Sequence, residues 1–318
     1  MAAAVGMFAL GIFLLLLGGD SVLRGASGLA QRLGLSPFTA GLLLVSFAFS
    51  IPELAVNAYA MHAGLPDLAL GNAIGSNIVN IGLTLGISAL VAPLLASMRL
   101  LAVEVVLVLV STGAVLFFGL DGVIARWEGL VLLLGFAAFL VVAFRRGRQE
   151  GADARRELAQ HATTGSNIAQ NLLRLAMAAV MLYFGSRLVV QHAPAIGLAL
   201  GMGPMLTGLV VVAIATALPE VAVASLAAAK GQGNVVVASV LGACLFNLLL
   251  VVGGMAAWKP LALPESFLRL ELPAAMAFAL LLYPVLAGDL RIKRREGALL
   301  VLAFVAWLGF ELYVSLAG

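Results

Sequence analysis

Two short stretches decide how this chain folds: Ala48-Phe49-Ser50-Ile51-Pro52-Glu53 and Ala215-Thr216-Ala217-Leu218-Pro219-Glu220. Each places a proline and a glutamate inside an otherwise apolar run, and the two glutamates are 167 residues apart. The same offset relates four further pairs: Asn80 and Asn247, Gly41 and Gly208, Gly75 and Gly242, and Pro37 and Pro204. A carboxylate inside the hydrocarbon of a membrane is expensive and usually functional. Two such acids at equivalent positions of an internal repeat predict one shared cation site.

The composition predicts an integral membrane protein. Of the 318 residues, 63% are hydrophobic and 10% are charged, whereas about 25% are charged in an ordinary soluble domain. The basic residues lie in short loops between apolar runs, which predicts membrane orientation rather than nucleic-acid binding. The single cysteine, Cys244, excludes an internal disulfide and a thiolate metal cage.

The apolar runs are long enough to cross a bilayer and too unalternating for barrel strands. We expect ten spans, at about residues 3–19, 38–61, 68–91, 100–118, 127–144, 169–191, 204–229, 234–256, 267–287 and 298–315. Because only helices or closed barrels satisfy the backbone in lipid, the expected fold class is an all-α integral membrane protein with ten transmembrane helices.

The distribution of lysine and arginine predicts the topology. One set of loops carries 14 of these residues and the other set carries 4, which places both termini outside the cell. Residues 145–168 are then a cytoplasmic linker between two five-helix repeats, residues 1–144 and 169–318, whose motifs span residues 41–80 and 208–247. Five is odd, so the second repeat enters the membrane from the opposite face, as inverted repeats do.

The polar side chains near the two glutamates predict a site for a hard cation. Ser50 lies three residues before Glu53, and Pro52 frees a backbone carbonyl one turn earlier. The predicted ligand set combines both repeats: Ser50, Glu53, Ser76, Asn80, Thr216, Glu220 and Asn247. Carboxylate, amide and hydroxyl oxygens suit Ca²⁺ or Na⁺. Two negative charges match one divalent or two monovalent ions, which is a simple route to exchange.

Structural roles are the alternative for each of these residues. The asparagines could serve as interhelical hydrogen-bond partners, and the serine and threonine hydroxyls could bond their own helix backbone. Glu104 and Glu271 lie near predicted span starts, where we expect structural roles within reach of lipid headgroups.

These motifs, together with Gly71-Asn72-Ala73-Ile74-Gly75-Ser76-Asn77, resemble the alpha repeats of sodium/calcium exchangers and of the wider calcium/cation antiporter superfamily. The resemblance covers nearly the whole chain and is closest to the prokaryotic branch. It implies alternating-access antiport of Ca²⁺ against Na⁺ or H⁺ across the prokaryotic inner membrane, without a cofactor. It also implies that Glu53 and Glu220 are the central acids of the site.

Three positions depart from the family pattern: Phe49, Ala217 and Ala243 stand where the family usually has a hydroxyl ligand. The resemblance implies that Phe49 and Ala243 each remove one hydroxyl from the family's two outer Na⁺ sites, which leads to the hypothesis that a proton replaces one or more sodium ions.

Two other functions remain alternatives. The chain could carry Mn²⁺, Mg²⁺ or K⁺ on the same scaffold, or it could be a non-transporting membrane scaffold. An enzyme is not expected, because the sequence has no nucleotide-binding glycine loop followed by lysine.

Overall fold

The computed structural model describes residues 1–32, 50–95, 99–147, 167–287 and 291–317. Phe49, the first half of the predicted span 38–61, and most of the predicted linker lie outside these residues. The first part of the chain contains α1 (Ala2–Arg32), α3 (Ile51–His62), α4 (Pro66–Val79), η1 (Asn80–Leu85), α5 (Gly86–Val91), β1 (Leu94–Leu95), α6 (Arg99–Phe118), η2 (Gly119–Asp121), β2 (Val123–Ile124) and α7 (Arg126–Gly147).

The second part repeats this order. It contains α9 (Ile168–Ala199), α10 (Pro204–Leu206), η3 (Thr207–Val212), α11 (Ala213–Ala229), α12 (Gly233–Leu245), η4 (Phe246–Val252), α13 (Gly253–Trp258), β3 (Leu261–Ala262), η5 (Phe267–Glu271), α14 (Leu272–Ala287), β4 (Arg291–Ile292) and α15 (Arg294–Ala317). Segments η1, η3, η4 and η5 are π-helical and continue directly into their α-helical neighbours.

Among the described residues, eight continuous helices are long and apolar enough to span a membrane. The other two predicted spans correspond to α3, whose preceding residues are not described, and to η5 with α14. Two predicted boundaries were wrong. The span expected at 3–19 continues as α1 to Arg32, and the span expected at 169–191 extends to Ala199, because α9 continues through Pro194. A proline is tolerated within a membrane helix when neighbouring groups satisfy the freed backbone.

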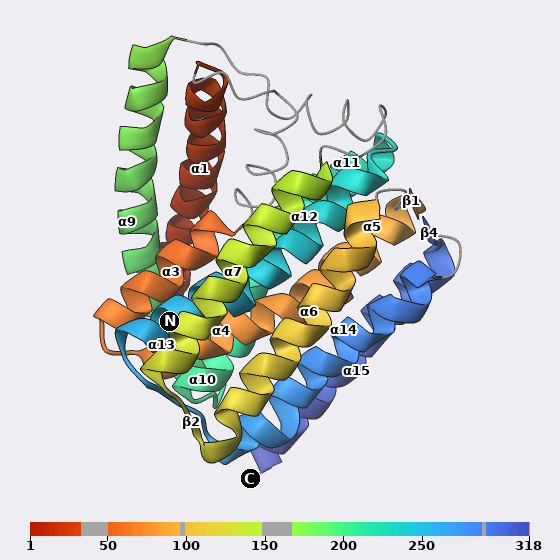
Figure 1. Ribbon diagram of the computed structural model, residues 1–318. Coiled ribbons are helices and arrows are strands. Elements are labelled where there is room, and N and C mark those ends of the chain that lie inside the picture. Colours follow the sequence, from red (N-terminus) through yellow and green to blue (C-terminus); the bar gives the residue numbers. More distant parts are fainter. Residues whose placement is uncertain (33–49, 96–98, 148–166, 288–290, 318) are drawn as a thin grey trace.

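Two equivalent spans form the core of the bundle. The span Gly233–Trp258 (α12, η4 and α13) is 94% buried, and the span Pro66–Val91 (α4, η1 and α5) is 78% buried, whereas α15 is only 22% buried over its span. Figure 1 shows α1 and α9 side by side at one edge of the molecule, with α14 and α15 at the other. The peripheral helices therefore present their apolar side chains to lipid.

The two parts of the chain contact each other in a matched way, as expected for a repeat. Strand β1 pairs with β4 through Leu94 and Ile292, and β2 pairs with β3 through Ile124 and Leu261. Leu261 is the repeat equivalent of Leu94, and Ile292 is the equivalent of Ile124. Strand β1 therefore corresponds to β3 and β2 to β4, so the repeat symmetry relates one small sheet to the other.

Glycine pairs show the same relationship. Helix α5 packs on α15 where Gly86 faces Gly297, and α13 packs on α7 where Gly253 faces Gly129. A Cβ atom on Gly86 would lie 3.1 Å from the Gly297 carbonyl oxygen, and one on Gly253 would lie 3.1 Å from the Gly129 carbonyl oxygen. The chain is an all-α membrane protein built from two inverted repeats.

Close backbone approach also holds the two predicted motif regions together. Gly75 in α4 packs against the backbone of Leu209 in η3, and Gly208 in η3 packs against the backbone of Leu68 in α4. No side chain fits between backbones at this spacing, so small residues are required. This crossing brings α4 of the first repeat against η3 and α11 of the second.

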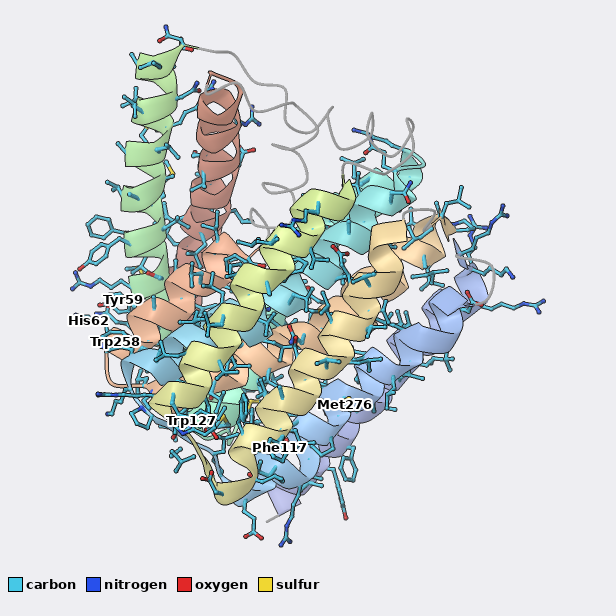
Figure 2. All side chains as sticks on the ribbon, in the orientation of Figure 1. Tyr59, His62, Phe117, Trp127, Trp258 and Met276 are labelled. Atoms are coloured by element: carbon cyan, nitrogen blue, oxygen red, sulfur yellow. The ribbon has the colours of Figure 1, made fainter. Side chains whose placement is uncertain are left out.

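Aromatic side chains mark one end of the bundle. Trp127 is the second residue of α7 and Trp258 ends α13, and both are more than half exposed. Figure 2 shows Trp258 near Tyr59 and Trp127 farther along the same edge, opposite β1 and β4. Exposed tryptophans at helix ends are typical of a membrane–water interface.

Candidate cation site

The two glutamates lie at corresponding places in buried helices. Glu53 is in the first turn of α3, directly after Pro52, and is 0% exposed. Glu220 lies within α11, directly after Pro219, and is 6% exposed. The two carboxylates are close enough for their charges to interact. The structure thus brings together the two acids that the sequence predicts to meet.

The Glu53 carboxylate faces groups from both repeats. The Ser76 hydroxyl of α4 and the Asn247 side chain of η4 both lie within interaction range of it. Within the described part of the chain, neither Glu53 oxygen makes a hydrogen bond of good geometry, and Glu220 Oε1 also has no partner. Buried polar groups are normally hydrogen-bonded, so unpartnered carboxylate oxygens at the centre of the molecule require an explanation.

The two predicted asparagines lie at the π-helical segments. Asn80 is the first residue of η1, and both its side-chain polar atoms are without a partner among the described residues. Asn247 is the second residue of η4; its Nδ2 donates to Asn77 Oδ1 at 3.3 Å, whereas its Oδ1 is unpartnered in the same set. π-Helical turns often occur at functional sites because they re-aim side chains within a helix.

The predicted hydroxyl residues divide into two groups. Ser50, at the N-terminal cap position of α3, and Ser76 are both 0% exposed and have unpartnered Oγ atoms among the residues that the structure describes. Thr216 Oγ1 instead donates to the carbonyls of Val212 at 2.9 Å and Ala213 at 3.2 Å. Thr216 therefore makes the backbone bond expected of a structural role. Its hydroxyl hydrogen is used, but its oxygen lone pairs remain available.

The two prolines differ in their effect. Helix α3 begins at Ile51, so Pro52 occupies its first turn, where a missing amide has little effect on the helix. Helix α11 continues through Pro219, so it does not end at the proline. Proline has no amide hydrogen, so it cannot supply the helix bond to the carbonyl four residues earlier, that of Ala215.

Further buried polar residues of the first repeat escaped the sequence prediction. Asn72 Nδ2 donates to Asn57 Oδ1 at 2.9 Å, and both residues are 0% exposed. Asn57 lies four residues after Glu53, so its position on the same face of α3 is a signal in the sequence. The repeat equivalent of Asn57 is Ala224, so this pair has no counterpart in the second repeat.

A narrow crevice, too small to hold a water molecule, lies beside Glu220. It is lined by Thr84, Glu220, Ala224, Ser239, Val240 and Ala243. Ser239 Oγ donates to Val236 O at 2.9 Å, so its hydrogen is used within its own helix. The lining therefore offers the Glu220 carboxylate and few other free polar groups.

The chemistry of the site is that of oxygen ligands. Around Glu53 these are the carboxylate of Glu220, the hydroxyl of Ser76 and the amide of Asn247, and the described residues hold no group of three or more His, Cys, Asp or Glu side chains. Oxygen donors of this kind suit hard cations. An inverted-repeat membrane fold with a central acidic pair defines the class of secondary-active cation transporters.

Comparison with known proteins identifies the family within this class. The family model described as "Sodium/calcium exchanger protein" matches residues 3–145 and 170–313. The chain therefore belongs to the sodium/calcium exchanger family.

Relatives and solved structures agree over almost the full length. The "Putative antiporter CaxA" of Alkalimonas amylolytica is 34% identical, over 93% of this chain and 95% of the relative. The "Inner membrane protein YrbG" of Escherichia coli (strain K12) is 31% identical, over 99% and 98%. The solved structure of the sodium-calcium exchanger NCX_Mj, soaked with Na⁺ and Sr²⁺, has a TM-score of 0.68 and 28% identity over 97% of this chain and 98% of that one.

Proposed function

We propose that this protein is a secondary-active antiporter that exchanges Ca²⁺ against Na⁺ or H⁺ by alternating access. The observation that carries the proposal is the buried pair Glu53 and Glu220, contributed by corresponding helices of the two repeats and left with unpartnered oxygens among the described residues. An antiporter and a sodium/calcium exchanger among the relatives support the substrate class.

The proposed ligands are the predicted set of Ser50, Glu53, Ser76, Asn80, Thr216, Glu220 and Asn247. Two carboxylates carry two negative charges, which one Ca²⁺ or two monovalent cations neutralise. If one Ca²⁺ and two monovalent cations were bound at the same time, the desolvated site would carry a net positive charge, which is strongly unfavourable. One ion type therefore leaves before the other binds, and this competition couples their movements.

The counter-ion follows from the substituted positions. Ala217 and Ala243 are buried, with exposed fractions of 0% and 1%. Because alanine has no hydroxyl, both positions lack the oxygen that the family usually has there. Phe49, the third substituted position, lies outside the described residues. Fewer oxygen ligands weaken Na⁺ coordination, whereas a proton needs only a carboxylate oxygen. We therefore extend the proposal to H⁺ as a counter-ion in place of one or more Na⁺ ions.

The proposed topology keeps the repeats at residues 1–144 and 169–318, joined by a cytoplasmic linker at 145–168, with both termini outside. The bias of basic residues between the two sets of loops supports this orientation. A relative named as an inner membrane protein supports the prokaryotic inner membrane as the location. The proposed activity is transport of inorganic cations, without enzymatic chemistry and without a cofactor.

The test is Ca²⁺ flux in liposomes that contain the purified protein. Vesicles are loaded with ⁴⁵Ca²⁺, and Na⁺ and pH gradients are imposed separately. Efflux that follows the pH gradient supports the proton hypothesis, and efflux that follows Na⁺ and ignores pH refutes it. Competition by Mn²⁺, Mg²⁺ and K⁺ separates Ca²⁺ transport from the alternative of another cation on the same scaffold.

Matched variants test the site itself. Glu53→Gln and Glu220→Gln keep the side-chain shape but remove one charge each, so efflux should fall to that of vesicles without protein. Glu296→Gln is the control, because Glu296 caps the start of α15 through the Lys293 amide at 2.7 Å, away from the central pair. Full activity of both central variants would refute the central pair as the transport site, whereas absence of efflux with the wild-type protein would favour the scaffold alternative.

A further inference from the structure

A second pair of buried acids lies apart from the central site. Glu271 ends η5 and is 5% exposed, and Glu311 lies in α15 and is 2% exposed. Their carboxyl groups are within hydrogen-bonding range of each other. Glu104 and Glu271 were both expected to lie within reach of lipid headgroups, and the burial of both side chains corrects that expectation. Glu311 lies inside the last predicted span.

This pair lines a cavity of about 330 Å³. The other walls come from the turn before α10, the turn before η5 and the end of α15, with Gly201, Gly203, Pro264 and Ser266 among the lining residues. Glu271 Oε2 and Glu311 Oε2 are both buried and have no hydrogen-bond partner in the part of the chain that the structure describes. The two carboxyl groups therefore lie in the wall of the cavity, and the Oε2 atom of each is buried without a donor in the described part of the chain.

The charge of the cavity is unbalanced. None of the described residues that line it is basic. The neighbouring Glu265 forms an exposed ion pair with Arg269, so that arginine is already matched with an acid. Two carboxylates that face each other at a buried position need a counter-charge, and either a shared proton or a cation supplies it.

We propose that Glu271 and Glu311 form a second binding site, for a divalent cation with the preference of Ca²⁺ for oxygen ligands. Two carboxylates neutralise one divalent ion, and the Ser266 hydroxyl is a further oxygen donor on the same wall. At about 30 Å³ for each water, the cavity holds roughly ten waters. A partly hydrated ion with six to eight oxygen ligands fits within it.

The site belongs to one repeat alone. The repeat equivalent of Glu271 is Glu104, but the position that matches Glu311 is Ala143. Symmetry of the fold therefore does not account for the pair. The cavity lies between the turns that precede α10 and η5, which the predicted topology places on the outer face. A cation held there would lie toward the outer face of the protein and would be distinct from the transported ion.

Equilibrium binding of ⁴⁵Ca²⁺ to the purified full-length protein tests this proposal. The double variant Glu53→Gln/Glu220→Gln removes the charge of the central site, and it should retain one bound Ca²⁺ per chain. Adding either Glu271→Gln or Glu311→Gln should abolish that remaining binding. Adding Glu104→Gln is the matched control and should leave it unchanged. Size-exclusion profiles identify any variant that fails to fold, and the two separate replacements give independent readings.

Two results would overturn the proposal. Absence of bound Ca²⁺ in the central double variant would mean that the pair holds a shared proton only. Remaining binding that persists in both Glu271→Gln and Glu311→Gln backgrounds would place the ion elsewhere. If Glu53 and Glu220 do not bind Ca²⁺, the wild-type protein and the central double variant would bind equal amounts of Ca²⁺. That result is distinguishable from failure of the second site, which would leave the central double variant without bound Ca²⁺.

Discussion

The adjacent glycines of α13 offer a matched test of how the repeats pack. A Cβ atom on Gly253 would lie 2.9 Å from Leu132 Cβ, 3.1 Å from the Gly129 carbonyl oxygen and 3.3 Å from the Leu133 amide nitrogen. A Cβ atom on Gly254 would meet nothing within 4 Å. We predict that Gly253→Ala destabilises the protein and that Gly254→Ala does not.

The size of the destabilisation by Gly253→Ala follows from these distances. Carbon atoms in favourable contact lie about 3.5–4.0 Å apart, so the new methyl group on Gly253 would be too close by roughly 0.6–1.1 Å. Two of the three neighbouring atoms belong to the α7 backbone and cannot rotate away. Overpacking of this kind costs about 1–3 kcal/mol. Both replacements gain the same helix propensity, about 1 kcal/mol, so this gain cancels in their difference.

Thermal unfolding of the two purified variants, at one scan rate and in one detergent, measures that difference. Gly253→Ala should unfold at a lower temperature than Gly254→Ala by at least about 2 °C, since 1 kcal/mol corresponds to roughly 2–4 °C in domains of 150–250 residues. Equal unfolding temperatures would refute the close packing of α13 on α7. Gly86→Ala, at the equivalent contact of α5 with α15, should behave like Gly253→Ala.

Two further predictions concern individual polar groups. Thr216→Val removes the hydroxyl but keeps the shape, so Ca²⁺ flux should fall by about 5- to 30-fold if the oxygen contributes roughly 1–2 kcal/mol as a ligand. Thr216→Ser keeps the hydroxyl and should keep most of the flux. Equal flux in the two variants would assign Thr216 a purely structural role. Asn72→Ala leaves Asn57 Oδ1 without its 2.9 Å donor, so the free energy of unfolding should fall by about 1–3 kcal/mol. A double-mutant cycle with Asn57→Ala that shows no coupling energy would contradict this hydrogen bond.

The sequence was sufficient for the all-helical membrane fold and for the encounter of the two acids. Proline and glutamate at a fixed offset are local signals, and burial in lipid limits what such residues can do. Gly75 and Gly208, which belong to different repeat pairs, lie where the backbones of α4 and η3 approach closely. That Glu53 and Glu220 coordinate a transported cation stays a prediction, since the structure gives their positions and their unpartnered oxygens only.

Other features depend on the tertiary structure. The π-helical turns at Asn80 and Asn247 have no reliable local sequence signal, because packing against neighbouring helices sets them. The continuation of α9 through Pro194 likewise depends on its surroundings. Glu311 was visible as an acid within an apolar span, but its pairing with Glu271 appears only when α15 lies against η5. Local patterns therefore predict which residues are unusual, and the fold determines which of them meet.

The symmetry-related sheets and glycine contacts between the two repeats have a consequence for the origin of the molecule. Each joins an element of one repeat to the non-equivalent element of the other: β1 with β4 and β2 with β3, α5 with α15 and α7 with α13. A single ancestral repeat, present as two copies inserted in opposite directions, would make all of these contacts as a homodimer. Fusion of the two genes would then have freed each copy to diverge, and an acid such as Glu311 is present in only one of them.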